Sequence, residues 1–193
     1  MNTLVVYCHP DPTSFTATVR ETALAALSEA GHDVRVRDLY ADGFEPRMSA
    51  GERVEHKQPG TRPELRAYAD ELRWCEHLVL VYPTWWSGQP AMLKGWIDRV
   101  WVRGVAWELP PGHDRIRGRL TNIRRLTAVT THGSSKLVNV FEGEGGKRTL
   151  GRTLRMLCHP RAKTRWLALY RIDCASADDR ARFLGKVTSV LGR

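Results

Sequence analysis

The sequence predicts an α/β fold in which a parallel sheet carries helices on both faces. Short apolar runs rich in β-formers alternate along the chain with longer segments of helical periodicity. Long loops follow several of the apolar runs, and no internal repeat or low-complexity segment breaks the alternation. With 193 residues and 42% hydrophobic content, the chain is long enough for a single domain with a sizeable core, which we expect to span residues 1–193.

The first elements are a strand, a helix and a second strand. Thr3–Cys8 is a short run of β-formers, and Phe15–Ala30 carries apolar residues at helical spacing until Gly31 ends the pattern. Val34–Arg37 alternates with charge, which predicts a less buried strand. The segment Tyr40–Thr61 is rich in Gly, Pro and charged residues, and we expect it to be a long loop.

The middle of the chain contains the clearest buried strand. Pro63–Glu76 is expected to be a helix with proline in its first turn. Leu78–Tyr82 is an uninterrupted apolar run, which is typical of a strand buried on both faces. Ala91–Trp101 has one apolar face and predicts a helix. Val102–Leu120 contains two adjacent prolines and is expected to be an irregular insertion.

The last third adds two strands and two helices. Leu126–Thr130 predicts the fourth strand, Leu150–Cys158 a helix, and Thr164–Leu169 the fifth strand. Asp178–Leu191 is expected to be the closing helix, because a capping-box pattern begins at Ser176.

Charge and cysteine content narrow the classes of function. The chain has 30 Lys and Arg residues against 21 Asp and Glu, a formal net charge of +9 that favours anionic partners. No nucleic-acid-binding module accompanies the scattered basic residues, so nucleic acid is not an expected partner. The four cysteines lack C-x-x-C spacing, and we recognise no signal peptide or membrane span, so we expect a cytoplasmic protein. The dispersed histidines predict no metal site.

Ligands of open α/β sheets bind outside the carboxyl ends of the strands. After the first predicted strand, the segment His9–Thr16 places hydroxyl side chains at a helix start and contains no glycine. Free N–H groups and the helix dipole make such a terminus an anion site, to which His9 adds a donor. The simpler alternative is that Thr13 or Ser14 only caps the helix.

The other two strand ends carry aromatic and small polar residues. Trp85 and Trp86 stand together in a loop stiffened by prolines, and each ring either fills the core or faces a flat ligand. We expect one of the two to fill the core. Thr130–Ser135 combines small polar residues with a glycine, so its N–H groups either bind the edge of a heterocycle or only close a turn.

These residues resemble a known family. The motif that carries the resemblance is Tyr82-Pro83-x-x-Trp86-x-Gly88-x-Pro90-Ala91-x-Leu93-Lys94-Gly95-Trp96-Ile97-Asp98-Arg99-Val100. It resembles the long motif of the NAD(P)H:quinone oxidoreductases of the DT-diaphorase type, within the flavodoxin-like superfamily. The resemblance implies a five-stranded sheet of order 2-1-3-4-5, a flavin (FAD or FMN), NADPH or NADH as electron donor, and a homodimer. We expect Val102–Leu120 and the apolar face around Trp96 and Trp101 to contribute to the dimer contact.

The resemblance also implies the cofactor-binding residues. The phosphate and ribityl chain of the flavin would be held by the first segment, through His9, Thr13, Ser14, Phe15 and Thr16. The ring would be lined from the other two segments by Pro83, Thr84, Trp85, Trp86, Ser87, Thr130, Thr131, His132 and Gly133. Thr16 and His132 stand where the family often has Asn and Gly. Val138 and its neighbours do not reproduce the Tyr and His that assist hydride transfer in the mammalian enzymes.

The function implied is that of an enzyme, a flavin-dependent NAD(P)H oxidoreductase that reduces a quinone or similar small organic acceptor by ping-pong hydride transfer. His132 is the candidate catalytic residue, because it and the N–H groups of Thr131–Gly133 would face negative charge at the flavin N1/C2=O edge. Glu142–Gly146 is expected to be a flexible turn or lid. Candidates for contact with nicotinamide-nucleotide phosphates are Arg115, Arg117, Arg119, Lys147 and Arg148.

Three alternatives stay open from the sequence. The first alternative is a flavin-binding regulatory subunit of the potassium-efflux type. The second is a one-electron carrier, and the third is a non-catalytic binding module that kept the fold. A net charge of +9 argues against the carrier, since flavodoxins are usually strongly acidic.

Overall fold

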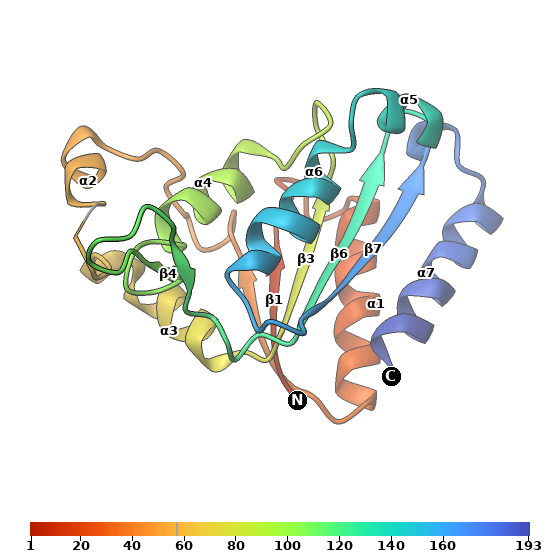
Figure 1. The fold of residues 1–193 in the computed structure, drawn as a ribbon. Coiled ribbons are helices and arrows are strands. Elements are labelled where there is room, and N and C mark those ends of the chain that lie inside the picture. The colour runs from red at the N-terminus through yellow and green to blue at the C-terminus, as the bar shows by residue number, and fades with distance from the viewer. Residues whose placement is uncertain (57) are drawn as a thin grey trace.

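Five parallel strands form the central sheet of the protein, in the order β2-β1-β3-β6-β7 (Figure 1). The computed structural model describes residues 1–56 and 58–193. The strands of the sheet are β1 (Asn2–Tyr7), β2 (Asp33–Asp38), β3 (His77–Pro83), β6 (Arg125–His132) and β7 (Lys163–Tyr170). Two further short strands, β4 (Trp107–Glu108) and β5 (Arg117–Gly118), pair antiparallel apart from this sheet. The predicted order did not include these two strands, so the strands predicted as fourth and fifth are β6 and β7.

Helices cover both faces of the sheet, and the first strand shows why. Leu4 and Val6 belong to one buried cluster, whereas Val5 and Tyr7 belong to the other, as the two-residue period of a strand requires. The first cluster packs under α3 (Arg66–Trp74) and α4 (Ala91–Val100), and the second under α1 (Phe15–Glu29) and α7 (Ala177–Leu191).

The remaining elements are short. They are α2 (Ala50–Glu55), η1 (Pro63–Leu65), α5 (Lys136–Phe141), α6 (Gly145–Arg148), the π-helical segment η2 (Thr149–Leu154) and η3 (Ile172–Cys174). The predicted capping box at the start of α7 is confirmed, since Ser176 and Asp179 exchange both hydrogen bonds. No helix within residues 1–56 and 58–193 is long and apolar enough to cross a membrane.

Several boundaries differ from those predicted. The segment Tyr40–Thr61 is not all loop, because it contains α2; position 57 lies outside the described residues. The helix expected at Leu150–Cys158 begins earlier, at Gly145, and α5 was not predicted at all. Both α2 and α5 are mainly exposed, so neither carries the buried stripe that predicts a helix from sequence.

The middle of α4 fits closely against the loop that precedes α2. A Cβ added at Gly95 would stand 2.6 Å from the Cα of Pro46 and closer still to that residue's Cβ and O. We expect Gly95→Ala to lower the free energy of unfolding by about 1–3 kcal/mol, because helix or loop must shift to admit the methyl group. Gly185→Ala in α7 is the matched control. Nothing lies within 4 Å of its added Cβ, so the better helix propensity of alanine should stabilise the protein by roughly 0.5–1 kcal/mol. Urea denaturation of both variants measures the two effects, and a Gly95→Ala protein as stable as the wild type would contradict the packing.

Candidate functional site

The three predicted segments meet at the carboxyl edge of the sheet, after β1, β3 and β6 (Figure 1). The N–H of Thr84 donates to the carbonyl of Thr131 at 2.8 Å, which extends the pairing of β3 and β6 beyond the strand ends. The hydroxyl of Thr84 lies 2.9 Å from the hydroxyl of Thr130 and 3.3 Å from Nε2 of His132. This network of two threonines and a histidine fixes the second and third segments to each other.

A cavity of about 530 Å³ opens at this edge. Eight of the predicted ring-lining residues line it: Pro83, Thr84, Trp85, Trp86, Ser87, Thr131, His132 and Gly133. Thr130 stands behind the wall of the cavity, where only 1% of its surface is exposed and its hydroxyl bonds Thr84. The volume lies within the range of small-molecule and cofactor sites.

The first segment lies beside this cavity and does not line it. His9 is its nearest link, with its ring centroid 6.4 Å from that of Trp85. The predicted phosphate-loop residues Thr13, Ser14, Phe15 and Thr16 follow at the start of α1. The structure therefore brings the ring-lining residues together in one pocket and places the first segment next to it.

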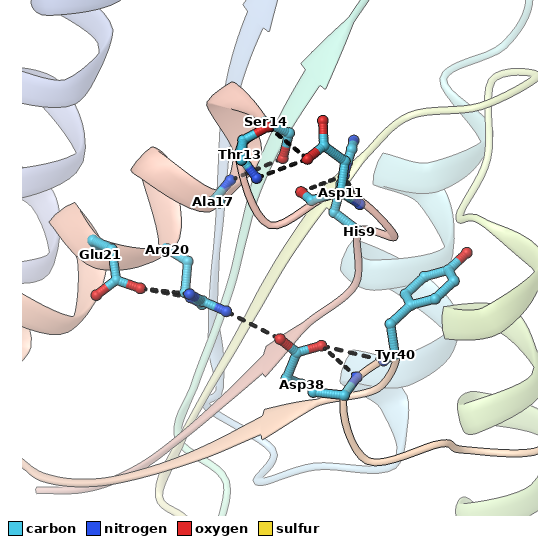
Figure 2. Close-up of polar contacts among 10 residues, drawn as sticks. His9, Asp11, Thr13, Ser14, Ala17, Arg20, Glu21, Asp38 and Tyr40 are labelled. Atoms are coloured by element: carbon cyan, nitrogen blue, oxygen red, sulfur yellow. Dashed lines mark hydrogen bonds and ion pairs between the residues drawn. The ribbon is translucent and has the colours of Figure 1, made fainter.

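Figure 2 shows how side chains shape the first segment. Ser14 caps α1 by accepting a hydrogen bond from the N–H of Ala17 at 3.2 Å. One carboxylate oxygen of Asp11 accepts from both the N–H and the hydroxyl of Thr13, each at 2.7 Å, and these bonds lower the pKa of Asp11. Nδ1 of His9 in turn accepts from the N–H of Asp11 at 3.0 Å.

Two donors at the start of α1 have no such partner. Within the described part of the chain, no hydrogen bond reaches the N–H groups of Phe15 and Thr16, the first two residues of the helix. These are the orphan donors of a helix N-terminus, where the dipole also favours an anion. Capping by Ser14 and anion binding are thus compatible, because they use different N–H groups.

The second segment presents both tryptophans to solvent. Trp86 is fully exposed and Trp85 is 42% exposed, so the expectation that one of them fills the core is wrong. Trp85 and Gly88 exchange two backbone hydrogen bonds, of 3.2 and 3.0 Å, around a tight turn. The turn puts Trp86 and Ser87 at positive φ, 48° and 59°, which is uncommon for residues with a side chain. The strained turn directs the rings away from the core.

His132 is the buried polar group of the third segment. Only 4% of its surface is exposed, and its ring stacks on Tyr170 with centroids 4.7 Å apart. Burial lowers its pKa, against the raising influence of the Asn139 side chain and of the carboxylates of Glu142 and Glu144. The ring is therefore neutral near pH 7, and one nitrogen donates while the other accepts. Within the described residues, Nδ1 has no hydrogen-bond partner.

Five further lining residues were missed from the sequence: Ser134, Asn139, Glu142, Ile172 and Asp173. Glu142 accepts a hydrogen bond from the Ser87 hydroxyl, and the N–H of Gly146 donates to the carbonyl of Ser87 at 3.0 Å. The segment Glu142–Gly146 is therefore tied to the tryptophan turn, whereas a free turn or lid was expected. A Cβ at Gly145 would stand 3.0 Å from the carbonyl oxygen of Ser87, so a glycine allows the two backbones to approach closely. The glycines of this segment are the sequence feature that could have indicated the contact.

The basic residues proposed for nucleotide phosphates do not line this cavity. Lys147 pairs with Glu144 at 2.9 Å, and Lys147 and Arg148 border a neighbouring hollow beside η2. Arg115, Arg117 and Arg119 lie in the segment of β4 and β5. Among the residues that the structure describes, no group of three His, Cys, Asp or Glu side chains could hold a metal ion.

Comparison with known proteins gives the same architecture. A family model described as the flavodoxin-like fold matches residues 1–157. Ribosyldihydronicotinamide dehydrogenase [quinone] of Homo sapiens is 30% identical over 162 residues, which cover 75% of this chain and 69% of that protein. The Pongo abelii protein of the same name is 31% identical, and the match spans only 64% of its length.

Two solved structures extend the comparison over the whole chain. Smu.1420 from Streptococcus mutans UA159 superposes with a TM-score of 0.86 at 31% identity, covering 100% of this chain and 99% of that one. An FMN-dependent NADH-azoreductase from Bacillus anthracis, solved in complex with FMN, gives a TM-score of 0.77 at 17% identity and the same coverage, which shows likeness of fold.

Proposed function

The chain belongs to the flavodoxin-like-fold family that includes the quinone-reducing NAD(P)H dehydrogenases, and from this premise we propose that it is a flavin-dependent NAD(P)H oxidoreductase. The observation that carries the proposal is the 530 Å³ cavity, which gathers two exposed tryptophans and the Thr131–Gly133 backbone at the carboxyl edge of the sheet. We propose a quinone or a similar small organic acceptor as the substrate.

The residues present fit a flavin. Exposed rings of Trp85 and Trp86 offer apolar surface to a flat heterocycle, and Thr84 with His132 offers polar atoms at the wall. The free N–H groups of Phe15 and Thr16 lie at a helix terminus suited to a phosphate. Because the first segment adjoins the cavity through His9 and Trp85, one ligand could contact both.

When bound, a flavin accepts a hydride from a nicotinamide nucleotide and passes electrons to an acceptor, which we propose occurs in two alternating half-reactions. The protein's part is to position both ligands and to stabilise charge. The N–H groups of Thr131, His132 and Gly133 would donate to the ring edge, as an oxyanion hole donates to developing charge. His132 would act as a neutral imidazole, since burial lowers its pKa. The exposed tryptophan turn would limit access of water.

His132 tests this assignment directly. We expect His132→Ala to slow flavin reduction by NADPH or NADH on the order of a hundredfold, because a donor near the developing charge is lost. Stopped-flow absorbance at the flavin band measures the rate, and the flavin content of the purified variant controls for binding. His113→Ala, at an exposed histidine between β4 and β5, is the matched control and should reduce at the wild-type rate. Unaltered reduction in His132→Ala would reject the role of this histidine, and no reduction of wild-type holoprotein by either nucleotide would reject the enzyme.

We also propose a homodimer, with a different contact from that expected. Trp96 and Trp101 are core residues, 0% and 5% exposed, so they cannot form the interface. A cluster of exposed apolar side chains lies beside the cavity, on Trp86 and on α5, where Leu137 and Phe141 are 78% and 94% exposed. A second copy covering this surface would close the site. Light scattering at micromolar concentration should give twice the chain mass of 21.9 kDa, and a monomer would contradict the proposal.

The cysteines support a reducing compartment, which we propose is the cytoplasm. All four are free thiols, and burial raises the pKa of Cys8 and Cys158 to about 12. The buried thiols of Cys8, Cys75 and Cys158 are therefore unreactive, and these three residues serve packing.

A further inference from the structure

A second polar cavity lies at the opposite edge of the sheet, where β3, β6 and β7 begin. It has a volume of about 310 Å³, and we call it the basic pocket. Its lining is Met1, His77, Arg124, Arg125, Thr127, Arg161, Lys163, Arg165 and Val190. Arg125 and His132 are the first and last of the eight residues of β6, so the basic pocket lies about 20 Å from the candidate flavin cavity.

Strand register brings the positive charges of the basic pocket together. Arg125 of β6 has Lys163 of β7 as its register partner on one side and the uncharged ring of His77 of β3 on the other. Two residues further on, Thr127 of β6 pairs with Arg165 of β7. Like charges on neighbouring strands repel one another, so this arrangement costs stability unless an anion lies between them.

The cations of the basic pocket lack carboxylate partners. Its lining contains five Lys and Arg residues and no Asp or Glu. Within residues 1–56 and 58–193, no ion pair joins any of the five to a carboxylate. Arg125 and Arg165 donate instead to the carbonyls of Arg193 and Val190, at 2.9 and 2.8 Å. Those two arginines are thereby positioned, while their charge is left uncompensated.

His77 provides a second, independent observation. Its surface is 3% exposed, and its Nε2 lies 2.9 Å from the hydroxyl of Thr127. Nδ1 is buried and has no hydrogen-bond partner within the described residues, which is costly for a polar atom unless a ligand or water satisfies it. Burial, reinforced by Arg125, lowers the pKa of His77 to about 3, so the ring adds a polar contact without further charge.

We propose that the basic pocket binds a small molecule that carries a diphosphate or triphosphate group. Such a group places several negative charges in a small volume, which matches five cations around 310 Å³. A guanidinium group can bind two phosphate oxygens at once, and four lining arginines come from β6 and β7 or the residues that flank them. The basic pocket opens at the amino edge of the sheet, opposite the flavin cavity. Its ligand is therefore a different molecule from the nicotinamide nucleotide that would reduce the flavin.

The direct test is calorimetric titration of the purified protein with inorganic pyrophosphate and, separately, with ADP, at low ionic strength. The test variant is Arg124→Gln/Arg161→Gln, because both side chains are exposed and neither makes a hydrogen bond or ion pair within the described residues. We expect it to weaken pyrophosphate binding at least tenfold. ADP binding should fall by a similar factor, because the diphosphate is the part recognised; an unchanged ADP affinity would overturn the assignment of a ligand that carries a diphosphate.

The control variant, Arg53→Gln/Arg66→Gln, removes the same net charge at exposed positions outside the basic pocket. It should bind pyrophosphate like the wild type. Equal losses in the two variants, or no pyrophosphate binding by the wild type, would overturn the proposal. Duplex DNA is the third arm: if it displaces pyrophosphate at a lower concentration and depends on the same two arginines, the pocket belongs to a nucleic-acid surface and the small-molecule assignment fails.

Discussion

Replacing Arg99 with methionine is expected to lower the free energy of unfolding by about 3–5 kcal/mol, because it leaves a buried carboxylate without its partner. Nε of Arg99 lies 2.7 Å from Oε1 of Glu52, and each side chain is only 7% exposed. The guanidinium also donates to the carbonyl of Glu45. One side chain of α4 thus holds the segment from Glu45 to α2 against the body of the protein.

Two further variants show how much of the lost stability comes from breaking the buried ion pair. Lys94→Met breaks an exposed pair with Asp98 on the same helix and should cost less than about 1 kcal/mol. Arg99→Met/Glu52→Met removes both buried charges and should regain a large part of the stability lost in the single variant. Urea denaturation followed by circular dichroism measures all three. A loss under 1 kcal/mol in Arg99→Met would mean that water reaches Glu52 and that the pair is not truly buried.

Removing both exposed tryptophans is expected to weaken flavin binding by about 100-fold, since an aromatic ring stacked on a base is worth roughly 1–3 kcal/mol. The variant is Trp85→Ala/Trp86→Ala. Its fold should be little affected, because Trp86 is fully exposed and Trp85 nearly half exposed in the free chain. Titration of flavin-free protein with FMN and with FAD, followed by quenching of flavin fluorescence, gives the affinities.

The matched control for the tryptophans is Leu109→Ala/Ile116→Ala. These side chains are 36% and 42% exposed, and they lie near β4 and β5, outside the cavity. The control should bind flavin with wild-type affinity. If the tryptophan variant loses less than threefold, the rings do not contact the flavin, and their exposure serves another purpose such as the dimer contact.

The parallel sheet could be predicted because its information is local. Four of the five strands contain a short apolar run, and β2 alternates apolar with charged residues. The burial of Val5 and Val6 on opposite faces follows from their alternation along one strand. Helix α2 could not be predicted, because its only buried residue is Glu52, whose partner Arg99 lies 47 residues away. A charged residue in a polar segment gives no signal of burial until the fold supplies its partner.

The candidate site, too, could be predicted from the sequence only in part. Residues that follow strand ends could be proposed from the sequence, because parallel strands bring their carboxyl ends to one edge. Ile172 and Asp173 also follow a strand, β7, but no motif distinguishes them, and they were missed. The basic pocket could not be predicted from the sequence either. Arg125 and Lys163 are remote in sequence and become neighbours only through the register of β6 and β7.

We expect the cavity at the carboxyl edge of the sheet to hold a flavin. The most direct measurement is to denature the purified protein and to identify the released chromophore by chromatography against FMN and FAD standards. We predict one of these two flavins at close to one molecule per chain, or uptake to that ratio when flavin is supplied during purification. A colourless protein that releases no flavin and takes up neither FMN nor FAD would contradict the account.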